Sequence, residues 1–398
     1  MSETLTPLPP LTVESKLDLR ALAEEHMQEG GLFVYEKDVL RGAANSLLEL
    51  EMPFGLTVRY AAKANPHRQI IRLFDGMGLH FDASSVQEAL ELIREGVDPS
   101  KISLSSQILR ENRQLGYMIG EGLRPVATSL RQIEMLGRLG CDEIAVRVNP
   151  GKGYGHNNRT NVGGSASSFG IWHELLPSIK IAAQKADVSI NRLHTHIGSG
   201  ADPAVWREVI QKSLGIAERL PDVETLDIGG GYKVARMPDE DSTDVNEVGS
   251  IFAEELQAFA DRTGRELRLE MEPGTLLVAN AGKLAGRIEE IVRTDVYEFL
   301  KLNVGMNALI RPSMYGAQHP IEVLNNSKSY KPYVVVGPCC ESGDILTPAP
   351  RDSEGIRERV LKKAHIGDIV VIGGAGAYAK TMAASSYNHI PPPTEIFR

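Results

Sequence analysis

Short runs rich in β-branched and aromatic residues alternate with amphipathic helical runs from about residue 32 to residue 275. Residues 87–94 and 252–259 show the helical pattern most clearly, and Glu95-Gly96 closes the first of these runs. Such alternation is typical of parallel strands joined by crossover helices. The pattern predicts eight strands, at Val58–Ala64, Leu79–Ser84, Ile102–Ser106, Pro125–Ser129, Ile144–Asn149, Leu193–Gly198, Thr225–Gly230 and Arg268–Pro273.

Eight strand–helix units in roughly 240 residues predict an α/β protein built on a (β/α)8 TIM-type barrel. A doubly wound open sheet is the alternative, but no Gly-x-Gly-x-x-Gly follows the first strand. From about Gly282 the pattern changes to β-rich runs separated by turn residues, such as residues 333–337 and 368–374. We therefore expect the barrel at residues 32–275, with a cofactor site at its strand ends, and a mostly β domain at 276–398. An N-terminal segment, residues 1–31, is expected to join the β domain in part.

Composition narrows the class of protein. Of 398 residues, 42% are hydrophobic and 24% charged, which is typical of a globular protein. The net charge of −9 argues against a nucleic-acid or anionic-membrane partner. No apolar run is long enough to span a membrane, and the N-terminus lacks a signal-peptide layout. The three cysteines provide neither a disulfide framework nor zinc-ligand spacing, so we expect no metal, reduced thiols and a cytoplasmic location.

Chemically useful residues end six of the predicted strands. A (β/α)8 barrel carries its catalytic groups at the strand C-termini, so such a gathering is expected on one face. A lysine is unusual near the end of a buried strand, because burial of its ammonium is unfavourable unless the charge is paired or lost. Burial that lowers a lysine pKa also suits a lysine that forms imines. The residues in question are Lys63, Asp82, Arg147, His194, His196, Ser199, Asp227, Gly229, Gly230, Gly231, Glu270, Glu272, Gly274 and Thr275.

Together these residues describe a site for an anionic, ring-shaped cofactor. The glycine turn at 229–231 and the Gly274-Thr275 pair offer backbone N–H groups suited to a phosphate, and Ser199 adds a hydroxyl. His196 can lie flat on a ring, while Glu272 can hold a pyridine nitrogen protonated. With an imine-forming Lys63, the set predicts a site for pyridoxal 5'-phosphate (PLP), a cofactor that acts as an electron sink.

The chain also resembles the alanine-racemase-fold (fold type III) PLP decarboxylases, and within them the diaminopimelate decarboxylases. The resemblance runs from about residue 30 to the C-terminus with all motifs in order. It implies a PLP-bearing barrel, a C-terminal β domain that takes in part of the N-terminal segment, and a head-to-tail homodimer with shared active sites. It rests on the motifs at residues 60–66, 194–199, 227–231, 272–274, 311–315, 337–344 and 376–378.

The resemblance implies a role for each matching residue. Lys63 binds PLP covalently, His196 stacks on its ring, Glu272 pairs with its nitrogen, and Ser199, Gly231 and Gly274 hold its phosphate. Asp82 and Arg147 support the lysine's side of the site. Cys340, donated by the neighbouring subunit, is the expected proton donor, and Cys339 the packing residue beside it. Arg311, Tyr315 and Glu341 are expected to contact an amino-acid substrate, and Tyr378 to contact both cofactor and substrate.

The long glycine-rich stretch after the fifth strand is expected to be either a surface loop or a lid over the substrate. As a lid it would bring Lys152, His156 and Arg159 toward a substrate carboxylate. One position departs from the family pattern, because Thr275 stands where diaminopimelate decarboxylases carry an arginine for the distal carboxylate of the substrate.

Three functions stay open on the sequence alone. The first is a decarboxylase of meso-diaminopimelate, which yields lysine. The second is a racemase or another decarboxylase of this fold, for ornithine, lysine, arginine or a specialised metabolite. The third is a non-catalytic relative. The Cys-Glu-Ser-Gly-Asp signature at 340–344 favours decarboxylation over racemisation, and the retained Lys63 and Cys340 favour an enzyme.

Overall fold

A computed structural model describes residues 6–153, 163–196 and 198–398. The chain forms two compact units, which we describe separately. The barrel unit comprises residues 42–233 and 241–277, and the β unit comprises residues 1–41, 234–240 and 278–398. Both boundaries lie C-terminal to those expected from the sequence. Across the described part of the chain, no helix has the length and hydropathy that a bilayer span requires.

Eight parallel strands close the barrel, as the sequence predicts. Their order is β5-β4-β3-β2-β10-β9-β8-β6, and pairing of β5 with β6 completes the circle. The short strand β7 (Ile171–Trp172) adds to the edge of β6. The eight strands are β2 (Leu56–Ala61), β3 (His80–Ala83), β4 (Ile102–Leu104), β5 (Arg124–Ala127), β6 (Glu143–Asn149), β8 (Ser189–His194), β9 (Thr225–Asp227) and β10 (Arg268–Met271).

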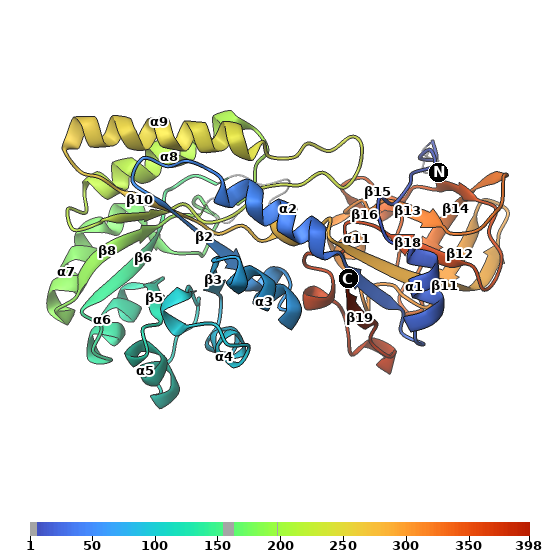
Figure 1. Cartoon of the computed structure of the whole chain (residues 1–398), viewed down its shortest axis with the longest axis horizontal. Coiled ribbons are helices and arrows are strands. Elements are labelled where there is room, and N and C mark those ends of the chain that lie inside the picture. Colours follow the sequence, from blue (N-terminus) through green and yellow to red (C-terminus); the bar gives the residue numbers. More distant parts are fainter. Residues whose placement is uncertain (1–5, 154–162, 197) are drawn as a thin grey trace. The chain divides into compact units, whose positions relative to one another are not determined.

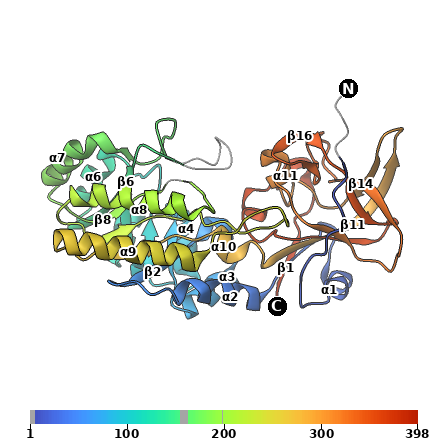
Figure 2. The same cartoon turned by 90° about the horizontal axis from the view of Figure 1, so that it is seen from above.

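A helix follows each of the first seven barrel strands and covers the outside of the sheet (Figure 1). Side chains before several of these helices accept a hydrogen bond from the first turn, for example Ser85, Ser129 and Asp244. The longest two, α8 and α9, lie side by side (Figure 2). The helices are α3 (Arg68–Gly76), α4 (Val86–Arg94), α5 (Arg113–Gly120), α6 (Leu130–Arg138), α7 (Leu176–Ala186), α8 (Pro203–Glu218) and α9 (Val245–Thr263), preceded by α2 (Lys37–Leu48) and followed by the short α10 (Thr275–Val278).

The β unit is built on one sheet with the strand order β13-β18-β11-β12-β14-β17. Chain segments far apart in sequence meet there, because β1 pairs with both β11 and β19. Val13, Leu19 and Ala23 from the N-terminal region pack into its core with Val371. Its elements are α1 (Leu19–His26), β1 (Leu32–Tyr35), β11 (Gly282–Arg293), β12 (Glu298–Leu302), α11 (Arg311–Tyr315), β13 (Ile321–Val323), β14 (Tyr330–Val336), β15 (Pro348–Ala349), β16 (Asp352–Ile356), β17 (Arg359–Lys362), β18 (Ile369–Ile372) and β19 (Thr394–Phe397).

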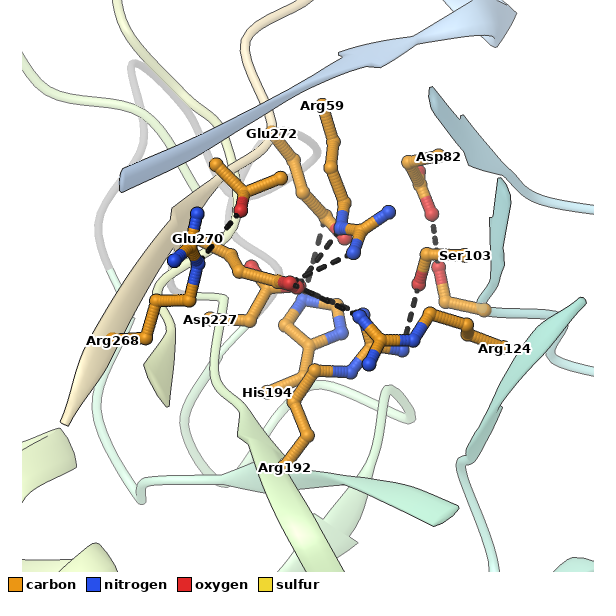
Figure 3. Close-up of polar contacts among 12 residues, drawn as sticks. Arg59, Asp82, Ser103, Arg124, Arg192, His194, Asp227, Arg268, Glu270 and Glu272 are labelled. Carbon is orange, nitrogen blue, oxygen red and sulfur yellow. Dashed lines mark hydrogen bonds and ion pairs between the residues drawn. The ribbon is translucent and has the colours of Figure 1, made fainter. Parts of the chain in front are cut away.

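A buried ion network fills one layer of the barrel interior. The Glu270 carboxylate on β10 accepts hydrogen bonds from Arg59 Nε and Nη2, at 2.9 and 2.7 Å, and from Arg192 Nη1 at 2.8 Å (Figure 3). Arg192 also donates to Ser103 Oγ at 3.0 Å. Burial raises the pKa of Glu270, but the charges of the two arginines outweigh it and hold that pKa below its ordinary value. The network therefore ties strands β2, β4, β8 and β10 together beneath the strand ends.

Candidate active site

Lys63 lies at the end of the first barrel strand, but outside the strand itself. β2 ends at Ala61, and Lys63 sits in a 3-10 turn, Ala62–Ala64. The predicted strand, Val58–Ala64, is therefore too long by this turn. The Lys63 side chain is 40% exposed and donates to Asp82 Oδ2 at 2.7 Å. It is a paired, accessible amine rather than the fully buried one that the strand prediction implied.

Asp82, at the end of β3, is fully buried and holds the lysine in place. Its second oxygen, Oδ1, accepts from Ser105 Oγ at 2.7 Å. Burial raises the pKa of Asp82, but the Lys63 ammonium and the Ser105 hydroxyl bring it below its ordinary value. Asp82 therefore stays ionised and fixes the direction of the Lys63 amine.

A second carboxylate, Glu272, lies just after β10 and is also buried. Its Oε2 atom is 3.5 Å from His194 Nε2, and Oε1 has no hydrogen-bond partner among the residues that the structure describes. Burial and the negative charge of Asp82 raise the pKa of Glu272 to about 7. A buried carboxylate oxygen without a partner is uncommon in proteins, and a cationic N–H group would satisfy it.

Asp227 and His194 line the same part of the barrel interior as Glu272 (Figure 3). One side-chain ligand atom from each of the three lies within 4.8 Å of the others. Burial and the Glu272 charge raise the pKa of Asp227 to about 8, and burial lowers that of His194 to about 4. The sequence predicted no role for either residue. It offered one clue, because residues 194 and 196 of a strand would point to the same side.

His196 follows β8 and is kept neutral. Burial and the charge of Arg147 hold its pKa well below the ordinary value. Its Nδ1 atom has no hydrogen-bond partner in the described part of the chain. The backbone at Gly229 is left-handed, with φ +69°, and a Cβ atom there would lie 2.7 Å from His196 Nδ1. Glycine at position 229 therefore leaves room for the imidazole of His196. Arg147 on β6 lies over the Phe169 ring, 5.2 Å from its centroid.

The remaining barrel residues lie in tight turns that follow three strands. At Gly231 the backbone has φ +108°, and a Cβ atom there would collide with the Gly198 carbonyl group. Ser199 follows Gly198 in the loop after β8. Gly230, in the turn after β9, also packs closely against the Glu272 carbonyl. Gly274 is buried just after β10, and the half-buried Thr275 begins α10. The barrel thus brings together all eleven of the site residues that the sequence placed in it.

The other predicted site residues lie in the β unit. Arg311 begins α11 and Tyr315 ends it. Cys340 and Glu341 are exposed in the turn after β14, where Cys340 N–H donates to Asn388 Oδ1 at 2.7 Å. Tyr378 follows β18 with a left-handed φ of +54°.

The two adjacent cysteines differ in environment. Cys339 is half-buried, and burial together with the Asp344 carboxylate raises the pKa of its thiol to about 12. Its backbone N–H also donates to Asp344 Oδ2 at 2.9 Å. Cys339 is thus held neutral in the turn, as a packing residue should be, while the Cys340 side chain is exposed.

Comparison with known proteins decides the family. Residues 41–279 match the model of the pyridoxal-dependent decarboxylase, pyridoxal binding domain. A curated relative from Streptomyces coelicolor, a diaminopimelate decarboxylase, is 31% identical over 95% of this chain and 86% of its own. One from Escherichia coli K12, of the same name, is 30% identical over 92% and 88%. A crystal structure of diaminopimelate decarboxylase superposes with a TM-score of 0.88 and 27% identity, covering 98% and 94%.

The chain belongs to the pyridoxal-dependent decarboxylase family. It is a PLP-dependent carboxy-lyase, and its (β/α)8 barrel with a β domain is the fold of that family. The residues of the barrel fit the cofactor of these decarboxylases. The free Oε1 of Glu272 suits a protonated pyridine nitrogen, the neutral His196 suits a ring face, and the turn at 229–231 has no side chains to obstruct a phosphate.

The predicted lid residues of this decarboxylase have different outcomes. His156 and Arg159 lie outside the described residues. Lys152 donates to both oxygens of Glu208 on α8, at 2.5 and 2.7 Å. An ion pair of this kind engages the Lys152 ammonium, which weakens it as a candidate for a substrate carboxylate.

Proposed function

We propose that this decarboxylase removes one carboxylate of meso-diaminopimelate as CO2 and releases L-lysine. The observation that carries the proposal is the buried Glu272 carboxylate, with one oxygen unpartnered in the described chain, in the same circle of strand ends as Lys63. The curated relatives, which match 92–95% of this chain, act on that substrate by name. A lysine-biosynthesis role follows from the product.

The barrel residues bind and orient the cofactor. When bound, PLP accepts the electron pair that remains after CO2 leaves. Lys63 would hold it covalently, with the amine oriented by Asp82. Glu272 would accept the N–H of the pyridine ring, which would stabilise the ionised form of this carboxylate against its raised pKa. His196 would support a face of the ring, and Arg147 the side of the site that holds the lysine.

The phosphate of the cofactor is proposed to lie among the turns after β8, β9 and β10. The Ser199 hydroxyl and the backbone N–H groups of residues 229–231 donate to it, and Gly274 and Thr275 contribute from the turn after β10. Phosphate sites in barrels of this kind commonly lie at the last two strands. These glycines allow the backbone to approach the phosphate closely.

The β unit is proposed to supply the substrate contacts and the proton. Arg311 and Tyr315 bind the carboxylate that is not lost, Glu341 binds the ammonium beside it, and Tyr378 contacts both cofactor and substrate. The exposed Cys340 thiol returns a proton to the carbon from which CO2 departs. An accessible thiol suits this transfer better than the half-buried Cys339, whose raised pKa makes it a weaker acid.

Thr275 favours a second candidate, a same-fold decarboxylase for a diamino acid without a distal carboxylate, such as ornithine, lysine or arginine. A threonine hydroxyl does not replace the charge-assisted bidentate contact of an arginine. Arg311 keeps a charge for the same end of the substrate, and we therefore favour diaminopimelate.

The Arg311→Ala variant tests this choice. We expect the KM for meso-diaminopimelate to rise about 10- to 150-fold, because removal of a charged hydrogen-bond donor costs roughly 1.5–3 kcal/mol. Steady-state CO2 release measures it, with the exposed Arg287→Ala of the same unit as the control. An unchanged KM in Arg311→Ala would show that Arg311 does not bind the substrate.

We also propose a homodimer in which Cys340 of the partner subunit completes each active site. Mixing Lys63→Ala with Cys340→Ala protein, each inactive alone, should then restore activity. Statistical exchange puts about a quarter of all sites in the intact state, because one of the two sites of a mixed dimer carries neither lesion. No recovery, with subunit exchange demonstrated by a labelled protein, would argue for a site built within one chain.

The same proposal covers location and partners. We infer that the enzyme works in the cytoplasm on a small amino-acid substrate, without a nucleic-acid or membrane partner. The net charge of −9 supports this inference, since it disfavours polyanionic surfaces.

A further inference from the structure

Two arginines and a histidine gather at the end of β18 in the β unit. The Arg236 Nε–H donates to the Gly374 carbonyl at 2.9 Å, and His319 Nδ1 lies 2.9 Å from the carbonyl oxygen of the preceding residue, Gly373. Burial lowers the pKa of both Arg236 and His319, and the charge of the nearby Arg311 lowers each further. We call Arg236, Arg311 and His319 the cationic cluster; two of its members, Arg236 and His319, are held by successive carbonyl groups.

Several polar atoms of the cationic cluster are buried and unused. Arg236 Nη2, Arg311 Nε and His319 Nε2 have no hydrogen-bond partner among the described residues. His319 is 0% exposed. Buried donors are nearly always satisfied in folded proteins. The unused donors of two neighbouring guanidiniums therefore indicate an anion that binds here.

The charges of the cluster leave room for one negative group. Glu240 is the carboxylate that acts on both arginines, and its Oε2 accepts the Arg236 backbone N–H at 2.8 Å. Burial and the charges of Arg311, Arg236 and Arg359 lower the pKa of His319, which keeps it neutral. The guanidiniums of Arg236 and Arg311 outnumber this one carboxylate, and Arg359 adds a further positive charge beside His319. A ligand carboxylate at this point would offset part of the excess positive charge.

The turn after β18 fixes where Arg236 can point. Gly374 has a left-handed φ of +63°, and a Cβ atom there would lie 2.8 Å from Arg236 Cδ. The absence of a side chain lets the aliphatic part of Arg236 pack on the turn, while its Nε–H is held by the Gly374 carbonyl. The guanidinium is therefore pre-oriented, which reduces the entropy lost when it binds a ligand.

We propose that Arg236 joins Arg311 in binding the substrate carboxylate distal to the reacting carbon, and so supplies the charge that Thr275 lacks. The inference rests on the proposed function, since it requires a substrate with a distal carboxylate. It assigns Arg236 a part in substrate specificity that its position, outside every motif used in the sequence analysis, does not reveal. Lys152, the other described candidate, is engaged by Glu208.

The test isolates the distal carboxylate. DL-2-Aminopimelate and DL-2-aminoheptanoate have the same seven-carbon chain and differ only in whether the far end is a carboxylate or a methyl group. The holoenzyme is titrated with each, and cofactor absorbance gives the two Kd values without reference to turnover. We expect the wild type to prefer aminopimelate, and Arg236→Gln to lose about 10- to 100-fold of that preference.

Two further variants separate binding from folding. Arg236→Lys, which keeps a charge and a donor, should restore part of the preference, and Arg287→Gln, an exposed arginine of the same unit, should leave it intact. A preference that Arg236→Gln retains in full overturns the inference alone, provided the wild type decarboxylates diaminopimelate. A wild type that shows no preference and acts on lysine or ornithine instead overturns the proposed function. If Arg236→Gln does not fold, a preference that Arg236→Lys keeps at least in part supports the charge role, and complete loss of the preference contradicts it.

Discussion

Lys63→Ala is expected to lower decarboxylation by about a thousandfold or more, because covalent attachment and proton transfer at the amine are lost together. The variant should still bind PLP, since Glu272, His196 and the glycine turn are intact, but without a covalent link. Turnover measures the first effect. Retention of the cofactor after borohydride reduction and denaturation measures the second, with wild type retaining it and Lys63→Ala releasing it.

The matched control is Lys212→Ala on α8. Its side chain is 39% exposed, close to the 40% of Lys63, and it too lies near a carboxylate, Glu208. We expect Lys212→Ala to keep wild-type turnover and covalently bound cofactor. Near-wild-type turnover in Lys63→Ala would show that the active site does not use the lysine at the end of β2.

Glu270→Ala is expected to produce the largest loss of stability. Removal of this carboxylate leaves the buried guanidiniums of Arg59 and Arg192 without their shared partner, and breaking a buried ion pair in this way costs about 3–5 kcal/mol. Urea unfolding of the holoenzyme, followed through the barrel transition, gives the change in the free energy of unfolding.

The effect of Glu270 should depend on pH in a defined direction. Its pKa in the folded state lies below the value of the unfolded chain. The stability that it contributes is therefore present above the unfolded pKa and is lost as pH falls through the folded pKa. The difference between wild type and Glu270→Ala should be constant from about pH 6 to pH 8 and shrink in acid. Glu254→Ala, in a surface pair with Arg207, should cost under about 1 kcal/mol. A loss of that size for Glu270→Ala would show that the network contributes little.

Periodicity was sufficient to predict the barrel. Seven of the eight strands begin within two residues of their predicted starts, because alternating buried runs and capped helices are local signals. The exception is β8, which was predicted at Leu193–Gly198 but lies four residues earlier, at Ser189–His194. Lys63, Asp82, His196 and Glu272 meet because parallel strands end on one face, which a strand list already implies.

Contacts between distant side chains were beyond such reasoning. The gathering of His194, Asp227 and Glu272, and the sharing of Glu270 by two arginines, depend on which strands become neighbours across the barrel. The sequence offered one clue to the sharing of Glu270, since a charged residue inside a buried strand requires a partner. Arg236 gave no signal at all, because its neighbours come from β18 and α11, far along the chain.

The central claim is that the protein converts meso-diaminopimelate to lysine. The most direct measurement incubates purified PLP-loaded protein with meso-diaminopimelate, ornithine, lysine and arginine in parallel, and quantifies CO2 and the amine product of each. The account predicts equal amounts of CO2 and lysine from meso-diaminopimelate, at a kcat/KM well above that for the other three. A clearly higher kcat/KM for ornithine, lysine or arginine would contradict it, and would make the threonine at position 275 the mark of a substrate without a distal carboxylate.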